Sequence, residues 1–220
     1  MQKFAVITGD IVGSKSIDID ERENLLHVLK KSFDEINENV IKDHHSTFEI
    51  FRGDSFQAVL RKPELSLIVS ILIRARLRSE NANIPLKKKN WDARLAIGIG
   101  DIQFNTNKTV ESDGQAFLFS GRDLDNMKIT GERFRIQTPW SEVNAEMKVS
   151  FAFADSVISH WSKYQAQVFY YYLLQNEKQK ELAERFNISQ PAIHKRLSTG
   201  NVECIDLLRI RFENLISSQL

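Results

Sequence analysis

Runs of apolar and polar residues divide the first 140 positions into short strands and amphipathic helices. Residues 4–11 are rich in aromatic and β-branched side chains and end before Gly13, which predicts a buried strand. Residues 18–41 carry apolar side chains three and four positions apart, the spacing of a helix that packs on one face. Its apolar positions are Leu25, Leu26, Leu29, Phe33, Ile36 and Val40.

Two further short strands, at residues 48–51 and 56–60, flank the sequence RGDS, a turn in which glycine and aspartate adopt conformations that other residues resist. A second helix begins at Pro63 and Glu64, and residues 94–100 form another strand. The order of strand, helix, strand, strand, helix, strand is that of a ferredoxin-like domain. Right-handed crossovers then place the first and third strands side by side and antiparallel.

The rest of the sequence changes from this mixed pattern to a helical one. Residues 132–140 predict a last strand that ends before Pro139, and from about Glu142 the apolar spacing is helical up to the C-terminus. We therefore expect an α+β chain of two domains: a ferredoxin-like domain in residues 1–150, followed by an all-α domain in residues 151–220.

Composition and charge limit the classes of function. The chain has 30 Lys and Arg against 29 Asp and Glu, so its net charge of +1 indicates no polyanion partner overall, and any nucleic-acid contact must be local. The lone Cys204 excludes an internal disulfide, which favours the cytoplasm, and its apolar helical context predicts a core position. The apolar run at residues 65–73 is too short to cross a bilayer, so we expect no membrane association.

Two acidic residues lie where the predicted sheet brings apolar segments together. Asp10 lies at the end of the first strand and Asp54 lies in the hairpin, and in a ferredoxin-like sheet these two points meet at one edge. Two adjacent carboxylates repel each other unless a proton or a cation lies between them, and Mg²⁺ suits such a place while leaving positions for phosphates. Backbone N–H groups at Gly13 and Ser14, with the charge of Lys15, could hold those phosphates. The alternative is that both acids are ordinary turn residues.

Four segments resemble class III nucleotide cyclase catalytic domains in order and approximate spacing: VITGDIVGSK, FRGDSFQAVL, ARLAIGIG and GQAFLFSGRDLDNM. The resemblance covers residues 1 to about 125 and implies a palm-like fold. It implies that Asp10, Asp54 and the backbone of Ile11 hold Mg²⁺ or Mn²⁺ over a nucleoside triphosphate. The positions that correspond to phosphate-binding ones are Val12, Gly13, Ser14, Lys15 and Gly53.

The chain departs from the cyclase pattern at residues that serve cyclisation in that family. The purine-selecting lysine falls on Ile50 and the transition-state asparagine on Leu118, whereas the arginine is kept as Arg122, the candidate catalytic residue. The resemblance therefore favours metal and phosphate binding over cyclisation. As a whole the chain is most similar to the SatD family of bacterial proteins, which implies a cyclase-like N-terminal part and a C-terminal helix-turn-helix.

Residues 177–201 have the spacing of a helix-turn-helix and resemble sigma-factor region four. Leu182 and Ala183 lie on the first helix, and Asn187 occupies a turn position that needs a left-handed backbone. If the unit binds DNA, its second helix lies in the major groove. The candidate DNA-contacting residues are Ser189, Gln190, His194, Lys195 and Arg196. The alternative is a structural three-helix unit or a protein-binding surface.

One face of the last predicted helix carries a stripe of apolar residues. They are Val202, Ile205, Leu208, Phe212 and Leu215. Such a stripe either joins two protomers, which would double the DNA contacts, or packs within its own chain. We expect a homodimeric DNA-binding regulator whose N-terminal domain senses a divalent metal with a nucleotide or another phosphate ligand. Two alternatives stay open: a Mg²⁺-dependent nucleotide cyclase or nucleotidyltransferase, and a degenerate cyclase-like domain kept for dimerisation.

Overall fold

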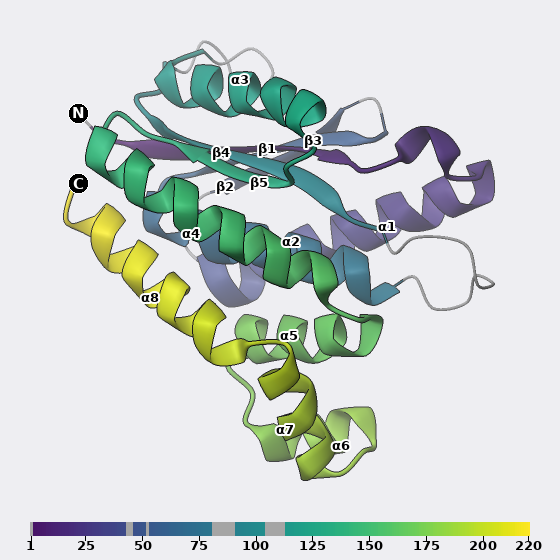
Figure 1. Ribbon diagram of the computed structural model, residues 1–220. Helices are drawn as coiled ribbons and strands as arrows, with labels where there is room; N and C mark the ends of the chain where they lie inside the picture. The colour runs from purple at the N-terminus through teal and green to yellow at the C-terminus, as the bar shows by residue number, and fades with distance from the viewer. Residues whose placement is uncertain (1, 43–45, 52, 81–90, 104–112) are drawn as a thin grey trace.

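A computed structural model describes residues 2–42, 46–51, 53–80, 91–103 and 113–220 of the chain. A central sheet has helices on both faces, and further helices from the C-terminal part lie beyond one of these helical layers (Figure 1). The chain is therefore a mixed α+β protein, as the sequence predicts.

The order of the strands in the sheet is ferredoxin-like. The strands are β1 (Phe4–Ile11), β2 (Ser46–Phe51), β3 (Ser55–Leu60), β4 (Ala93–Gly100) and β5 (Phe134–Gln137), and their order is β2-β3-β1-β4-β5. β1 is antiparallel to both β3 and β4, whereas β5 pairs parallel with β4. The first four strands confirm the predicted arrangement, and β5 extends the sheet beyond β4.

β1 is buried because helices cover both faces of the sheet. Ile7 and Ile11 belong to the main core, while Val6 packs with Ala116 of α3 (Gln115–Thr130). In Figure 1, α3 lies on one face, and α1 (Ile19–Ile36), α2 (Ser66–Glu80) and α4 (Ser141–His160) lie on the other. α1 continues into a π-helical turn, η2 (Asn37–Ile41), and a 3-10 turn, η3 (Pro63–Leu65), precedes α2.

The C-terminal helices share the core of the α+β part. They are α5 (Lys163–Gln175), α6 (Gln179–Phe186), α7 (Gln190–Thr199) and α8 (Val202–Ser217). In Figure 1, α8 runs beside α4, and α6 and α7 project at the far end. Phe169 of α5 and Phe212 of α8 belong to the same core as Ile7 of β1. Residue 150, the predicted domain boundary, falls inside α4, so the two predicted domains have this helix in common.

The apolar stripe of α8 packs within its own chain. Ile205 and Phe212 are buried, and the Phe212 ring centroid lies 6.1 Å from that of Phe151 in α4. The residues of the stripe that pack against the same core while partly exposed are Val202, Leu208 and Leu215. The structure thus supports the second interpretation of the stripe, and a homodimer would have to use another surface.

Two further predictions concern Cys204 and membrane-spanning helices. The prediction that Cys204 lies in the core is wrong: it is exposed, because the adjacent Ile205 is the residue that α8 turns inward. Among the described residues, no helix is long and apolar enough to cross a bilayer.

Candidate functional site

The first candidate site lies where β1 ends, at the edge of the sheet. In the antiparallel ladders Asp10 is opposite Ser55 of β3 and Arg94 of β4. The backbone N–H of Ile11 donates to the carbonyl oxygen of Asp54 at 2.8 Å, so the hairpin turn lies against the end of the strand. The two segments that the sequence predicts to converge therefore do lie side by side.

The Asp10 carboxylate is bound by an arginine. Arg94 Nε donates to Asp10 Oδ1 at 2.9 Å and Arg94 Nη2 to Oδ2 at 3.1 Å, a two-pronged ion pair. The two side chains are only 22% and 11% exposed. Sequence reasoning placed a second acid and a metal ion opposite Asp10 and did not consider Arg94. A signal was present, because an antiparallel strand that starts near residue 94 places its first residues beside the end of β1.

Asp54 has partners of its own in the loop that follows β1. Its carboxylate accepts a hydrogen bond from the Ser14 hydroxyl, with 2.8 Å between Oγ and Oδ2, and a longer one of 3.4 Å from Ser55. Gly13 and Gly53 have φ angles of 72° and 77°, in the left-handed region that glycine adopts readily. Both turns therefore need the glycines that the sequence places there, and the structure brings Asp54, Gly13 and Ser14 together.

The remaining predicted residues of this site are exposed or are hydrogen-bonded to other parts of the chain. The N–H of Val12 donates to the carbonyl oxygen of Asp92 at 2.9 Å. Lys15 is exposed in a 3-10 turn, η1 (Ser14–Ser16). Arg122 is exposed on α3, whose buried residues Ser120 and Leu124 face the sheet, so helical spacing directs Arg122 away from it.

These residues do not fit a preformed divalent-metal centre. Mg²⁺ and Mn²⁺ need several oxygen ligands, whereas both carboxylate oxygens of Asp10 accept hydrogen bonds from Arg94. In the part of the chain that the structure describes, no group of three or more His, Cys, Asp and Glu side chains could hold a metal ion. The positive charge beside Asp10 is that of the Arg94 guanidinium.

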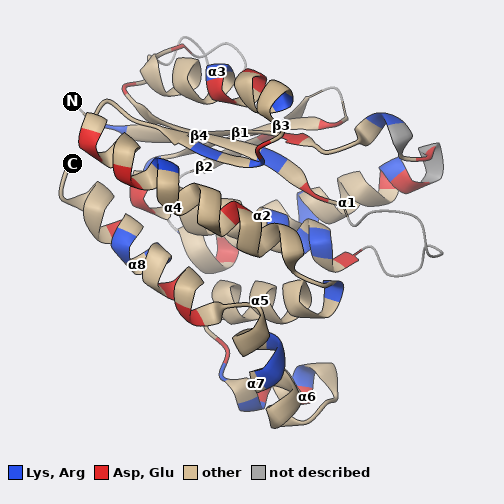
Figure 2. Ribbon diagram, viewed as in Figure 1, with Lys and Arg blue, Asp and Glu red and all other residues tan. Residues whose placement is uncertain are grey.

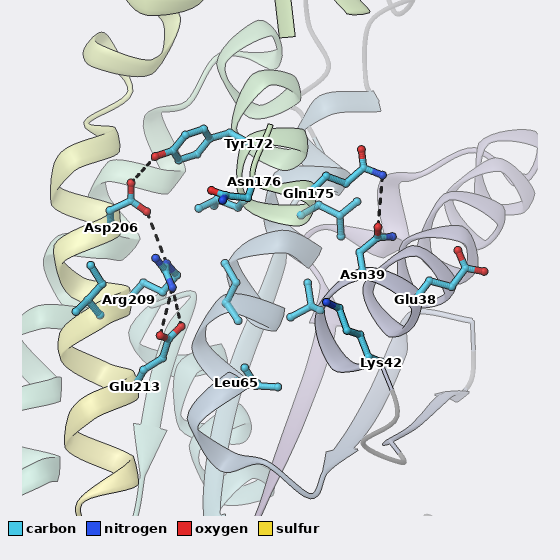
Figure 3. A pocket seen from close by; sticks show the side chains of 15 residues that line it. Glu38, Asn39, Lys42, Leu65, Tyr172, Gln175, Asn176, Asp206, Arg209 and Glu213 are labelled. Carbon is cyan, nitrogen blue, oxygen red and sulfur yellow. Dashed lines mark hydrogen bonds and ion pairs between the residues drawn. The ribbon is translucent and has the colours of Figure 1, made fainter. Parts of the chain in front are cut away.

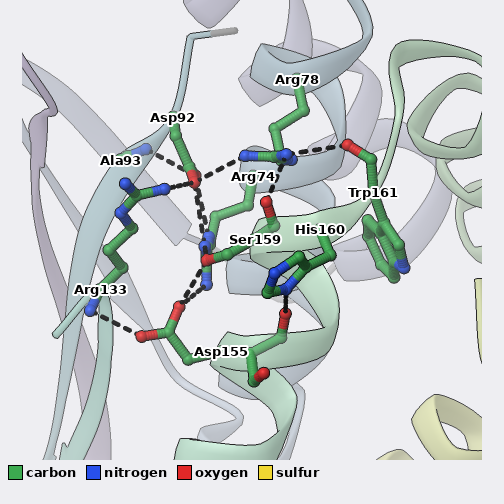
Figure 4. A network of polar contacts seen from close by, with 10 residues as sticks. Arg74, Arg78, Asp92, Ala93, Arg133, Asp155, Ser159, His160 and Trp161 are labelled. Atoms are coloured by element: carbon green, nitrogen blue, oxygen red, sulfur yellow. Dashed lines mark hydrogen bonds and ion pairs between the residues drawn. The ribbon is translucent and has the colours of Figure 1, made fainter. Parts of the chain in front are cut away.

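A buried network adjoins the same loop, centred on the side chain of Asp92 (Figure 4). This carboxylate accepts hydrogen bonds from Arg74 at 2.9 and 3.0 Å, from Arg78 at 3.0 Å and from Arg133 at 2.8 Å. Burial by itself raises the pKa of Asp92, but the three guanidinium groups outweigh burial and hold that pKa below its ordinary value. Asp92 therefore stays ionised, with three cationic partners.

The network continues to the end of α4 and the start of the C-terminal helices. Arg74 Nη1 donates to Asp155 of α4 at 2.8 Å. Arg78 Nη2 donates to the backbone carbonyls of Ser159 and Trp161, at 2.7 and 2.8 Å. Sequence reasoning missed this network. The available signal was the spacing of Arg74 and Arg78, one helical turn apart in an apolar helix, since buried arginines require anionic or carbonyl partners.

The second candidate site is the outer surface of α7. This helix follows α6 after a turn at residues 187–189, in which Asn187 has a φ of 51°, the left-handed conformation predicted for it. Ser189 is the N-cap residue, and its hydroxyl accepts a hydrogen bond from the N–H of Ala192 at 3.4 Å. Ile193 and Leu197 are buried, so the opposite side of α7 faces outward.

The predicted DNA-contacting residues lie together on this exposed surface. Gln190, His194 and Lys195 are exposed, and Arg196 is partly exposed. The Arg196 guanidinium lies 5.1 Å from the ring centroid of Tyr164, an exposed residue at the start of α5. Figure 2 shows Lys and Arg gathered on α7, and the helix contains no Asp or Glu. The surface is therefore locally cationic although the chain is nearly neutral.

The sequence profile of the SatD family matches residues 4–215, which is almost the whole chain. The chain belongs to the SatD family. A comparison of this SatD-family chain with curated proteins finds no match.

Solved structures similar to the SatD-family chain include two cyclase domains. One is the active GGEEF domain of a diguanylate cyclase from Vibrio cholerae, with 18% identity and a TM-score of 0.39 over 64% of this chain and 85% of that one. Another is the guanylyl cyclase Cya2, with 16% identity and a TM-score of 0.43 over 56% of this chain and 70% of that one. The strand order of the SatD-family chain establishes its ferredoxin-like fold independently of these likenesses.

Proposed function

We propose that this SatD-family chain is a DNA-binding regulator that contacts DNA through α7. The observation that carries the proposal is the exposed, cationic and acid-free face of α7, presented by a tight turn and anchored by buried residues on its other side. In helix-turn-helix proteins the second helix enters the major groove, and the residues of its first turn reach the base edges. Two short helices, α6 and α7, joined by a turn at residues 187–189, support this proposal.

The residues of α7 divide into two roles. Ser189 and Gln190 lie at its N-terminus, where a hydroxyl can bind a phosphate and a glutamine amide can pair with adenine. Lys195 and Arg196 lie one to two turns later and can bind phosphates or guanine. The contact of Arg196 with the Tyr164 ring restrains its guanidinium before DNA binds, which lowers the entropic cost of the contact.

Ion pairs elsewhere in the C-terminal helices concentrate the positive charge on α7. Residues 177–220 contain seven Lys and Arg against six Asp and Glu, so their net charge is only +1. Three of these arginines are paired with carboxylates away from α7. The pairs are Arg185–Glu177, Arg209–Glu213 and Arg211–Glu146. The cations of α7 thus dominate the field that an approaching duplex meets there.

The test compares two double variants that lose the same charge. Lys195→Gln/Arg196→Gln removes both cations of α7, and Lys128→Gln/Arg211→Gln removes two cations on α3 and α8. Binding to duplexes selected from a random pool is measured by fluorescence anisotropy between about 50 and 200 mM salt. We expect the α7 variant to bind at least about tenfold more weakly and its salt slope to fall by roughly 1.8, because each lost phosphate contact changes it by about 0.9. The control variant should bind like the wild type.

Two outcomes would contradict DNA binding by α7. Equal losses in the two variants would mean that binding follows net charge and not this helix. If no duplex is enriched and none binds even at low salt, the exposed face of α7 has another role, such as binding a protein.

We infer that the α+β part is a sensor or a scaffold and not a cyclase, because Arg94 engages both oxygens of Asp10. A nucleotide or other phosphate ligand belongs to this proposal, supported by the loop that joins Gly13 and Ser14 to Asp54. A homodimer also belongs to it, through a surface other than the buried stripe of α8. Sedimentation of the free and DNA-bound chain would measure the dimer.

A further inference from the structure

A pocket of about 770 Å³ lies between the α+β part and the C-terminal helices, and it includes none of the residues discussed above as acidic or DNA-contacting sites. Its walls are η2 with Lys42 after it, the start of α2, the last turn of α5 and one side of α8 (Figure 3). Pockets that bind small molecules have volumes of roughly 300–1,000 Å³. We propose that this pocket binds an organic cation, a protonated amine on a hydrocarbon chain.

The hydrocarbon part of such a ligand matches the apolar lining. Leu65 and Ile68 come from the segment where α2 begins, Val40 comes from η2, and Ile210 comes from α8. Ile210 is 48% exposed, which leaves much of a large apolar side chain in water. A ligand chain lying over these residues would remove apolar surface from water, which is favourable in proportion to the area covered.

The wall formed by α8 carries an excess of negative charge. Asp206, Arg209 and Glu213 project from α8 toward the pocket in Figure 3, two carboxylates against one guanidinium. Arg209 Nη1 lies 2.9 and 3.2 Å from the two oxygens of Glu213, whereas Arg209 Nε lies 3.6 Å from Asp206. Arg209 therefore neutralises mainly Glu213, and Asp206 is the carboxylate best placed to bind a further cation.

The other close partner of Asp206 is Tyr172, which carries no positive charge. The Tyr172 hydroxyl donates to Asp206 Oδ2 at 2.7 Å. Burial and this hydrogen bond raise the pKa of Tyr172 to about 12, so the phenol is a neutral donor at physiological pH. The bond fixes the orientation of the Asp206 carboxylate without cancelling its charge.

The opposite wall adds to the preference for a cation. Glu38 and Lys42 lie there and balance each other in formal charge. They belong to the C-terminal end of the helix that α1 and η2 form, and α5 also ends at this pocket, at Gln175. The C-terminal ends of helices carry partial negative charge. The start of α2, which also lines the pocket, carries a partial positive charge. The two negative helix ends outnumber this positive one, and together with the excess carboxylate of α8 they favour a cation over an anion.

The test uses the full chain and three probes of similar length in isothermal titration calorimetry. The probe 1,5-diaminopentane carries two ammonium groups, 1,5-pentanediol is neutral, and pimelate carries two carboxylates on the same chain of methylenes. We expect saturable binding of the diamine at one site and no measurable binding of the other two. Binding of pimelate or of the diol as tight as that of the diamine would overturn the assignment, and so would the absence of diamine binding.

Three variants test whether the diamine binds in this pocket. Asp206→Asn should weaken diamine binding about ten- to a hundredfold, the range expected for loss of a charged hydrogen-bond acceptor. Lys42→Met should tighten it about two- to fivefold, because the variant removes a like charge from the rim. Glu203→Gln, which removes an exposed acid of α8 outside the pocket, should leave it unchanged. If Glu203→Gln weakens binding as much as Asp206→Asn, the attraction is a general surface effect and the proposed site is wrong.

Discussion

At the residue scale, Asp10 shows how a strand-end acid is stabilised without a metal. Its side chain is 11% exposed, and a carboxylate removed from water to this extent needs a cation and hydrogen bonds to both oxygens. The guanidinium of Arg94 supplies both, in the planar geometry that matches a carboxylate. A divalent ion at this place would first have to displace Arg94.

We therefore predict that Mg²⁺ and Mn²⁺ leave the thermal unfolding temperature of the wild type unchanged, since a ligand that binds only the folded state would raise it. Arg94→Gln should lower stability by about 1–3 kcal/mol, because it leaves Asp10 without its charged partner. The double variant Arg94→Gln/Asp10→Asn should recover part of that loss, because the uncompensated charge is gone. A Mn²⁺-dependent rise in the wild type that disappears in Asp10→Asn/Asp54→Asn would contradict this account.

The sequence was sufficient to locate this site but not to assign its chemistry. The apolar pattern showed where β1 ends, and Gly13 and Gly53 marked turns whose positive φ angles the structure confirms. Which cation faces Asp10 depends on strand register, and periodicity does not determine the pairing of two strands that lie far apart in the sequence. The antiparallel strand order places the start of β4 near Asp10, but only the register in the structure shows that Arg94 is the residue opposite it.

At the scale of elements, α3 packs closely against the sheet. Gly98 of β4 lies directly beneath α3: a Cβ added there would be 2.1 Å from the carbonyl oxygen of Ala116 and 2.7 Å from the N–H nitrogen of Ser120. Both atoms are backbone atoms, so the helix could not relieve the clash by moving a side chain. The Thr8 hydroxyl, which donates to the Ser120 hydroxyl at 2.8 Å, depends on the same close approach.

Gly98→Ala should lower stability by about 1–3 kcal/mol, the usual cost of overfilling a packed core. In a chain of this size that corresponds to a fall in Tm of roughly 2–4 °C for each kcal/mol. Gly121→Ala is the matched control, because a Cβ at Gly121 in α3 meets no atom within 4 Å, and alanine is the better helix former. Its Tm should rise slightly. Equal effects of the two substitutions, measured by thermal unfolding, would mean that α3 does not pack closely on β4.

The sequence predicts the strands and helices more readily than the surfaces against which they pack. Strand and helix order follow from periods of 2 and 3.6 residues, which are local properties of the sequence, and the four predicted ferredoxin-like strands are all present. The stripe of α8 was also recognised, but the same spacing suits a dimer interface and an intrachain contact equally. The structure supports the intrachain contact, because Phe212 packs against Phe151 of the same chain.

At the scale of the whole molecule, Asp92 connects parts that are far apart in the sequence. Its carboxylate contacts arginines from α2 and from the segment before β5, and its backbone carbonyl holds the loop after β1. Through Arg78 the network also reaches the residues between α4 and α5. The loop after β1 and the residues that lead into the C-terminal helices are therefore joined through Asp92 and Arg78.

This network predicts how stability depends on pH. Because the pKa of Asp92 is lower in the folded chain than its ordinary value of about 4, its ion pairs stabilise the fold above that value. The contribution is lost as the pH falls through about 4 toward the lower folded pKa. Asp92→Asn, which leaves three arginines without this partner, should lower the unfolding free energy at neutral pH by about 3–5 kcal/mol and flatten its decline in acid.

Urea unfolding from about pH 7 to about pH 3 measures both effects. Glu146→Gln is the control, because the hydrogen bond from Arg211 also lowers the pKa of Glu146, but on the surface, where water screens the pair. The control should change stability far less than Asp92→Asn and leave the acid decline almost as steep as in the wild type. If the wild type and Asp92→Asn lose stability in parallel below pH 5, other carboxylates govern the acid response and Asp92 does not connect the molecule as argued.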